Sequence, residues 1–384
     1  MIILQYVLFH IILLAIIVVH SQKLTHCNDK DYWKCCFPLL LSFSIEEGLR
    51  WGRDTDWNLY YNVYEQIKNG ADVNFEFLFG SLLKNSAIIG LPYSIPITFC
   101  SFMWIFSLCY FIRPYKQCAK YFLPLCLLYF TVSVSNTFRW HLAMSFFLIS
   151  LRNLMDGHWG KGIVFLVCTL GSHTAAFGMS LIGVAFMYWF RRSFIVKPML
   201  VVAISILLIL LFQIDFMRNV VSIFDMFATK RFEGYVNNAE HWFYSETFEG
   251  ERKSLMQYLL LMTPFYVVLF ISHRLQIKKE LPDGYMFYNL LSFLIVFRSV
   301  TSGIELLQRM AMFYEFVLVL LVALIFHYKR NLAGSIRNLL IIVALFMIYK
   351  GYTGYFKLYD SEEQMKYVWN SRLMSPSEIS KKFR

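Results

Sequence analysis

The chain has 384 residues, of which 58% are hydrophobic and only 16% are charged. Soluble domains carry about 25% charged residues, so this composition excludes an ordinary water-facing fold and favours a bilayer. The net charge of +11 comes from short basic segments between apolar runs, without the basic stripe or motif that indicates a nucleic-acid-binding protein.

Apolar runs follow one another along the whole chain. A spanning helix needs about 20 mostly apolar residues. We expect helices at about 2–20, 35–48, 93–112, 120–137, 138–155, 160–172, 173–190, 198–214, 256–273, 285–303, 308–327 and 337–352. The first run has neither a basic start nor a small-residue cleavage site, which favours a retained helix. The predicted fold class is an all-α integral membrane protein with roughly 10–12 transmembrane helices, in a single polytopic domain over residues 1–384.

One stretch, residues 162–190, leaves two interpretations open because it is long for one helix and short for two. Two short helices meeting at Gly171-Ser172 keep all basic connections on one side of the membrane. A single tilted helix would reverse the side of every later connection. We therefore favour two helices.

Lysine and arginine gather on alternate connections, and the positive-inside rule places those connections in the cytoplasm. Both termini and two larger segments, about 49–92 and 214–255, then lie outside. The first of these segments contains two helical runs, 57–68 and 75–89, which we expect to lie on the membrane or dip into it rather than cross it.

Polar residues at the outer ends of apolar helices are the candidate site, because charges near hydrocarbon are costly and tend to mark function. Arg50 and Arg53 directly follow an apolar span, and Asp54 and Asp56 come next. Two guanidiniums can grip phosphate oxygens in a bidentate fork. The alternative is a helix end whose long side chains reach the surface and are neutralised by the acids.

Two further positions interrupt uncharged runs. Arg139 follows Asn136 and begins a helix, whose amino-terminal end also favours an anion; a topological anchor is the alternative. His173 lies in the longest charge-free stretch and could accept a proton near neutral pH. A hydrogen-bonded packing histidine is the alternative there.

The later half of the chain adds a weaker group. Glu305 and Arg309 are four residues apart and would share a helical face, while Glu315 needs a partner within its apolar helix. A structural ion-pair network is an equal alternative. The predicted outer side then collects arginines that favour a polyanionic, membrane-tethered substrate, namely Arg50, Arg53, Arg139, Arg231, Arg298 and Arg309.

Several short motifs follow one another over about residues 40–330. They are Arg50-x-x-Arg53-Asp54-x-Asp56-x-x-x-Tyr60, Glu76-x-Leu78-Phe79, Asn136-x-x-Arg139-x-x-Leu142-Ala143, Ser172-His173-x-Ala175 and Arg231-Phe232-x-x-Tyr235. Their order and spacing resemble the EpsG family of exopolysaccharide biosynthesis membrane proteins. The chain departs from the family pattern at Arg53, Trp140, Ser172 and Ala175.

EpsG proteins resemble the Wzy polymerases of O-antigen and capsule assembly. The resemblance implies a GT-C-like fold and a glycosyltransferase at the outer face of the bacterial inner membrane. It would join undecaprenyl-pyrophosphate-linked oligosaccharide repeats and release undecaprenyl pyrophosphate, with no metal and no other cofactor. The expected partners are these lipid-linked oligosaccharides and the bilayer, with a flippase and a chain-length regulator as further candidates and no nucleic acid.

The resemblance and the residue chemistry together predict three sets of site residues. His173 is the candidate catalytic base, with Asp54 and Asp56 as rivals. The pyrophosphate would be bound by Arg50, Arg53, Arg139, Arg231 and Arg309, and the rest of the substrate by Tyr60, Glu76, Asn136, Tyr235 and Arg298.

Three other functions stay open. A glycosyltransferase that uses a polyprenyl-phosphate sugar would hold a divalent metal at Asp54-x-Asp56. A lipid-linked oligosaccharide flippase or other transporter would typically show inverted repeats. An acyltransferase would use His173 as its base.

Overall fold

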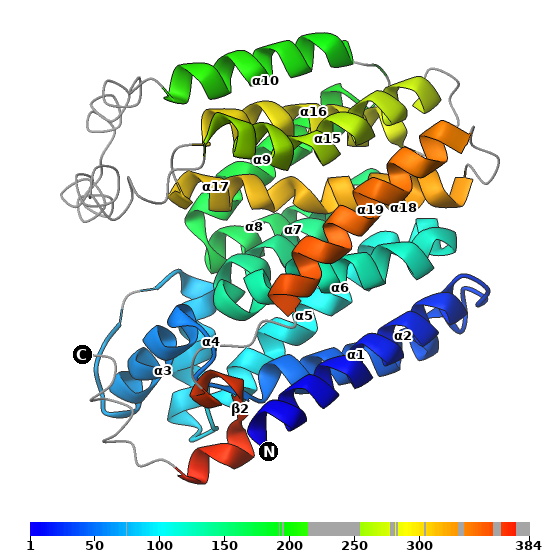
Figure 1. Ribbon diagram of the computed structural model, residues 1–384. Helices are drawn as coiled ribbons and strands as arrows, with labels where there is room; N and C mark the ends of the chain where they lie inside the picture. Colours follow the sequence, from blue (N-terminus) through cyan, green and yellow to red (C-terminus); the bar gives the residue numbers. More distant parts are fainter. Residues whose placement is uncertain are drawn as a thin grey trace, which may run out of the picture. The chain divides into compact units, whose positions relative to one another are not determined.

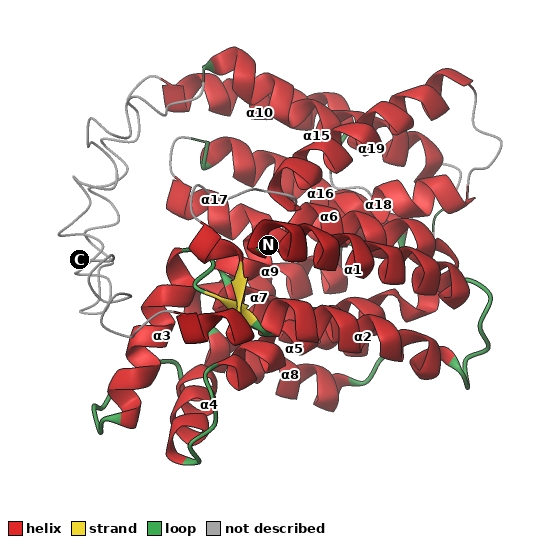
Figure 2. Ribbon diagram, turned by 60° about the horizontal axis from the view of Figure 1, so that its bottom comes forward, coloured by secondary structure: helices red, strands yellow, loops and turns green. Residues whose placement is uncertain are grey.

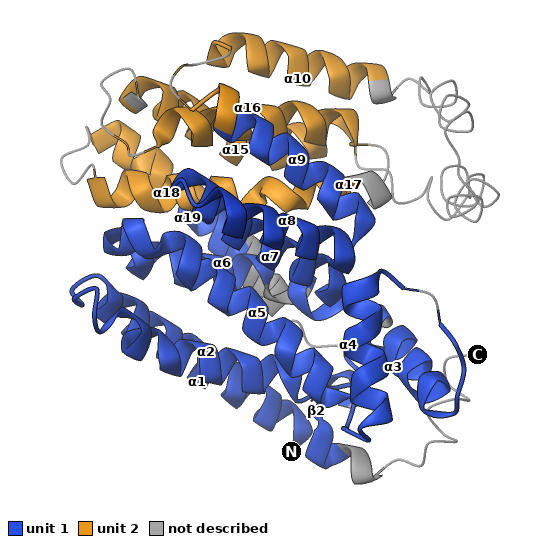
Figure 3. Cartoon of the chain, turned by 180° about the vertical axis from the view of Figure 1, so that it is seen from behind, with its two compact units in different colours: residues 1–187, 344–384 blue, residues 188–343 orange. Residues whose placement is uncertain are grey.

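The computed structural model describes residues 1–73, 75–191, 193, 196–213, 254–276, 281, 283–302, 305–328, 334–355 and 362–373. These residues are almost entirely helical, as Figure 2 shows. The chain divides into two compact units, residues 1–187 with 344–384 and residues 188–343 (Figure 3). The single polytopic domain over residues 1–384 stays a prediction.

The first unit contains most of the helices that the candidate site uses (Figure 1). α7 packs against α5 and α8, and α2 packs against α1 and α5. The bounds are α1 (Ile2–Leu24), α2 (Tyr32–Gly48), α3 (Thr55–Lys68), α4 (Phe77–Ile88), α5 (Ser94–Ile112), η1 (Arg113–Cys118), α6 (Ala119–Asn136), α7 (Phe138–Met155), α8 (Trp159–Ser172) and α9 (Thr174–Trp189).

A short C-terminal segment completes this unit. It comprises the 3-10 turn η3 (Glu362–Met365), the strand β2 (Lys366–Tyr367) and the 3-10 turn η4 (Val368–Leu373). β2 pairs antiparallel with β1 (Arg50–Trp51), which follows α2. α19 (Gly334–Tyr355) precedes the C-terminal segment along the chain.

The second unit is built around α16 (Gly284–Val300), which makes its most extensive contacts with three neighbouring helices. These are α10 (Pro198–Gln213), α15 (Leu255–Gln276) and α18 (Glu315–Tyr328). α17 (Glu305–Ala311) and the 3-10 turn η2 (Met312–Tyr314) lead into α18.

The helices confirm the predicted all-α membrane class. Four stretches of the described residues are long and apolar enough to cross a bilayer, namely Ile2–Leu24, Ser94–Phe130, Leu255–Leu275 and Gln308–Tyr328. Shorter apolar helices accompany them, including α8 and α9. The backbone at His173 is extended, with φ −162° and ψ 115°, and separates these two. The two-helix interpretation of residues 162–190 is therefore confirmed.

Gly48, the last residue of α2, lets that helix approach α5 closely. A Cβ atom at this position would lie 2.1 Å from Thr98 Oγ1 and 2.6 Å from Thr98 Cα. A larger residue would push the helices apart, because backbone atoms cannot yield as a flexible side chain can. The contact holds the end of α2, and the charged residues on it, against α5.

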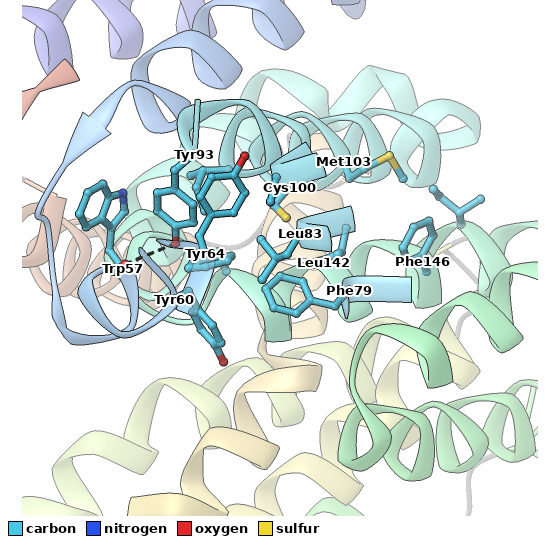
Figure 4. Packing of buried hydrophobic residues seen from close by; sticks show 14 residues of the cluster. Trp57, Tyr60, Tyr64, Phe79, Leu83, Tyr93, Cys100, Met103, Leu142 and Phe146 are labelled. Carbon is cyan, nitrogen blue, oxygen red and sulfur yellow. Dashed lines mark hydrogen bonds between the residues drawn. The ribbon is translucent and has the colours of Figure 1, made fainter. Parts of the chain in front are cut away.

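An aromatic core joins the segment 49–92 to the helices of the first unit (Figure 4). α3 and α4 contribute Trp57, Tyr60 and Phe79, which pack with Tyr93 and with residues of α5 and α7. The Tyr93 hydroxyl donates a hydrogen bond to the Trp57 carbonyl at 3.3 Å. Packed rings of this kind bury large apolar areas, so the two predicted helical runs form a fixed layer.

Candidate functional site

Arg139 is the second residue of α7 and is held on two sides. Its Nη1 donates to Glu76 Oε2 at 3.1 Å. The guanidinium carbon lies 5.5, 5.6 and 5.8 Å from the ring centroids of Tyr60, Phe75 and Phe79, within the range of cation–π attraction. The side chain keeps 21% of its surface exposed. Arg139 is thus positioned, yet still open to an anion.

Glu76, the residue before α4, joins Arg139 to the start of α9. Its Oε1 accepts hydrogen bonds from the Thr174 backbone N–H at 3.3 Å and from the Thr174 hydroxyl at 3.4 Å. Burial alone would raise the pKa of Glu76, but Arg139, the hydrogen bonds and nearby His173 outweigh it and hold that pKa below its usual value. The carboxylate is therefore ionised at neutral pH.

The close approach of α4 and α8 sets this geometry. A Cβ atom on Gly171 would lie 2.4 Å from Phe77 Cζ and 3.0 Å from Leu78 Cβ. Any side chain at this position would have to displace the Phe77 ring, so glycine lets the start of α4 reach the end of α8. Glu76 and Thr174 meet beside that contact.

His173 lies between α8 and α9 and is half-buried. Its ring meets Trp140 edge to face, with 5.0 Å between centroids and 89° between planes. Because Arg139 and Trp140 are consecutive, the imidazole, the guanidinium and the Glu76 carboxylate share one region. Three predicted site residues, far apart in sequence, thus come together.

Arg50 lies in a different setting. It is 1% exposed. Its Nη1 bonds to the Glu47 carbonyl, and it lies 3.3 Å from Glu47 Oε2. Its Nη2 donates to the Ser135 carbonyl at 3.0 Å, and the Ser135 hydroxyl donates to Glu47 Oε2 at 2.6 Å. Arg50 therefore ties the end of α2 to the end of α6.

Arg53 is also 1% exposed and is neutralised by two acids. Its Nη1 lies 3.7 Å from Glu46 Oε1 and 3.6 Å from Glu47 Oε1. Its guanidinium carbon lies 4.9 Å from the Tyr6 ring centroid and 5.5 Å from that of Tyr367. In this arrangement neither Arg50 nor Arg53 is open to a pyrophosphate.

The same cluster has the residue types of a metal site. Among the described residues, one group places three such ligand atoms within 4.8 Å of one another: His10, Glu46 and Glu47. His10 Nδ1 lies 3.4 Å from Glu46 Oε1. Two buried arginines already balance the two carboxylates, so a divalent cation would add uncompensated charge in a buried place. We favour an ion-pair network over a metal centre here.

The loop between β1 and α3 is strained. Asp54 has φ 66° and ψ 170°, a region that strongly favours glycine. The Asn58 side chain donates to the Asp54 carbonyl at 3.0 Å, and Asn136 Oδ1 accepts the Asp56 backbone N–H at 3.3 Å. Asn136 thus holds the start of α3. The Asp54 and Asp56 side chains are partly exposed, whereas Tyr60 is buried.

The second unit holds the remaining predicted residues. Arg298 pairs with Glu315 and lies over the Phe265 ring at 5.2 Å. Arg298 is therefore the partner that the sequence requires for Glu315 within its apolar helix. Arg309 is exposed. Arg231, Tyr235 and the Glu305 side chain lie outside the described residues. An outer chamber that combines all six arginines stays a prediction.

The acids Glu46 and Glu47 and the rings of Tyr6 and Tyr367 around Arg53 are not among the residues that the sequence predicts for the site. Glu46 and Glu47 stand at the end of an apolar run. Charges so close to hydrocarbon are costly and tend to mark function, so their position is a signal that could have identified them. His10 is one of the few polar residues within the first apolar run. Tyr367 has no local signal, because 321 residues separate it from Glu46.

The comparisons with known proteins gave one match. The EpsG family model matches residues 32–368. A search of the curated proteins and a search of the solved structures each gave no match. The matched span contains Glu76, Arg139 and His173 as well as both buried arginines.

Proposed function

Because the chain belongs to the EpsG family, we propose that it is a polysaccharide polymerase of the bacterial inner membrane. Membership makes it a multi-pass membrane protein of exopolysaccharide biosynthesis. The finer proposal is that it joins undecaprenyl-pyrophosphate-linked oligosaccharide repeats at the outer face and releases undecaprenyl pyrophosphate. The enzyme is then a glycosyltransferase that works without a metal.

The observation that carries this proposal is Arg139, held by Glu76 and partly exposed beside His173. Pyrophosphate is a good leaving group once its charge is balanced. A guanidinium fixed before the reaction stabilises the developing charge better than one that must reorganise. Glu76 engages one terminal nitrogen, Nη1, and a guanidinium has further donors for phosphate oxygens.

The reaction needs one general base and one positively charged group that stabilises the departing pyrophosphate. A hydroxyl of the acceptor repeat attacks the anomeric carbon of the growing glycan and forms the new glycosidic bond. The bond from that carbon to the pyrophosphate oxygen breaks, and its electron pair leaves with undecaprenyl pyrophosphate, which Arg139 stabilises. His173 takes the hydroxyl proton, with Asp54 and Asp56 as rival bases.

The other predicted residues receive narrower roles. Neighbouring carboxylates neutralise Arg50 and Arg53. We therefore propose that Arg139 stabilises the departing pyrophosphate and that Arg50 and Arg53 support the structure around it. Glu76 and Asn136 position the site. Tyr60 forms part of the aromatic cage around Arg139. Further substrate contacts are proposed for Arg231, Tyr235, Arg298 and Arg309.

The test is the glycan size ladder in the source strain after deletion of the gene. Wild type should restore long glycans, whereas Arg139→Ala at equal expression should leave single lipid-linked repeats on the outer leaflet. Arg113→Ala is the matched control, because Arg113 is exposed at the end of α5 and should restore the ladder.

Two outcomes would contradict the proposal. Repeats that accumulate on the inner leaflet of the deletion strain would indicate a flippase. A repeat one sugar short would indicate a glycosyltransferase that builds the repeat, and strict metal dependence would favour Asp54-x-Asp56 as its metal site.

A further inference from the structure

The C-terminal segment 362–373, here called the strap, lies across the cluster of Arg53, Glu46 and Glu47. Its strand pairs Tyr367 with Arg50 and Lys366 with Trp51. The Val368 backbone N–H donates to the Leu49 carbonyl at 2.9 Å. Figures 1 and 2 both show this strand pair beside the amino-terminal end of α1. The strap thus covers the outer ends of α1 and α2 in the predicted topology.

Tyr367 makes the contacts that close the cluster. Its hydroxyl donates to Glu46 Oε1 at 2.6 Å. The Arg53 guanidinium carbon lies over the Tyr367 ring, 5.5 Å from the centroid, and over the Tyr6 ring at 4.9 Å. The Trp369 ring stacks on Tyr367 with 5.0 Å between centroids and 7° between planes. One side chain therefore presents a hydroxyl to a carboxylate and a flat ring to a guanidinium.

The closed cluster leaves several buried polar atoms unsatisfied. Among the described residues, Arg53 Nε and Nη2 and Glu46 Oε2 have no hydrogen-bond partner, while Arg53 Nη1 and Glu47 Oε1 make ion-pair contacts, 3.6 Å from each other, but no hydrogen bond. Buried donors and acceptors without partners are costly and uncommon in a purely structural joint. The adjoining backbone at Asp54 is strained as well, and strain of this kind collects at ligand sites and switches.

We propose that the strap is a displaceable cover over a sugar-binding site formed by Glu46, Glu47 and Arg53, with Tyr367 in the place of a sugar ring. Sugar hydroxyls donate to carboxylates and accept from a guanidinium, so a glycan satisfies both sets of atoms at once. A phosphate does not, because the two carboxylates repel it. Tyr6 supplies an aromatic face beside the guanidinium.

This inference rests on the proposed polymerase function and adds a step to it. The site lies next to the segment that leads into α3, and the Arg50 network joins it to the end of α6 just before Arg139. The incoming repeat displaces the strap, takes over the contacts of Tyr367 and is held for transfer. The strap closes again once the glycan has moved on.

A disulfide lock tests whether the strap must open. Trp51 and Lys366 are directly opposed in the antiparallel pair, a spacing that a disulfide can bridge. The Trp51→Cys/Lys366→Cys protein is reconstituted in liposomes with lipid-linked repeats from the deletion strain. Oxidation, checked by electrophoresis without reductant, should abolish polymerisation, and a thiol reductant should restore it in the same sample.

The controls separate the lock from other effects of oxidation. The two single variants and the oxidised wild type, with its eight native cysteines, should keep their activity. A fully cross-linked protein that still polymerises would overturn the strap proposal and leave the polymerase intact. Reduced wild type that never polymerises would instead refute the proposed function.

A second readout does not depend on turnover or on the double variant. Lys366 is 7% exposed when the strap is closed, so the thiol of Lys366→Cys should react slowly with a maleimide. Added lipid-linked repeats should increase the labelling rate of that thiol, measured by mass spectrometry of its peptide. An unchanged rate at a repeat concentration that supports wild-type turnover would contradict opening.

Discussion

Glu76 Oε2 accepts a hydrogen bond from Arg139 Nη1 at 3.1 Å, while Oε1 of the same carboxylate accepts the Thr174 backbone N–H at 3.3 Å. One side chain thus connects the starts of α4, α7 and α9. An ionised carboxylate at a helix amino terminus is also favoured by the helix dipole. This relationship brings Arg139, the proposed stabiliser of the leaving group, and His173, the candidate base, into one region.

Replacing Arg139 tests the leaving-group role. Arg139→Ala should lower the polymerisation rate about 10²–10³-fold, the loss typical of removing one positioned donor to a developing charge. Arg139→Lys should recover only part of that activity, because an ammonium cannot serve Glu76 and two phosphate oxygens in one plane. The rate is measured with reconstituted protein and lipid-linked repeats. Full activity of the alanine variant would remove Arg139 from the role.

The Glu76 carboxylate predicts a pH dependence of stability. Its pKa is lowered in the folded protein from the ordinary 4.5, so its stabilising contribution is present above pH 4.5 and is lost as the pH falls through the lower folded pKa. Glu76→Gln should therefore be less stable than wild type at pH 7, by about 0.5–1 kcal/mol. The difference in melting temperature in detergent should shrink towards pH 3.5. An equal difference at both pH values would contradict this assignment.

The pair of Arg50 and Glu47 predicts a non-additive stability effect. Both side chains are 0% exposed, so removing either one leaves one uncompensated charge in the buried cluster of Arg50, Arg53, Glu46 and Glu47. Glu47→Met or Arg50→Met alone should cost about 3–5 kcal/mol, whereas the double variant should cost less than either single change. Thermal unfolding in detergent measures all three. A double variant as unstable as the sum of the singles would show that the pair is not coupled.

Gly48 offers a test of the packing that positions these acids. Gly48→Ala should destabilise the protein by about 1–3 kcal/mol, because the new methyl group meets the Thr98 backbone. Gly178→Ala in α9 is the matched control. Its added methyl group meets no atom within 4 Å, and alanine favours a helix over glycine by about 1 kcal/mol. Equal melting temperatures for the two variants would refute the close contact of α2 and α5.

Sequence patterns predicted the local features of the fold well. The runs at 57–68 and 75–89 correspond to α3 (Thr55–Lys68) and α4 (Phe77–Ile88). The predicted break at Gly171-Ser172 lies within two residues of His173, where the helix is interrupted. Apolarity, length and helix-breaking positions are properties of contiguous residues, so a linear reading can detect them.

The candidate site was predicted less completely. The sequence predicts Arg139, Glu76 and His173 as site residues, but only the fold shows that they share one region. Arg50 and Arg53 were expected to be open to phosphate and are instead buried against two acids. Their exposure could not be read from the chain, because it depends on which distant residues pack over them.

Hydrophobic length and ordered motifs are local, linear properties, so they suffice to identify a multi-pass helical membrane protein of the EpsG family. Which charged side chains meet depends instead on the folded arrangement of the helices. Tyr367 reaches Glu46 across 321 residues, and Glu76 reaches Thr174 across 98. Such pairs form because the packing of helices brings distant groups within hydrogen-bond distance, and buried charges are stable only where that packing supplies a partner.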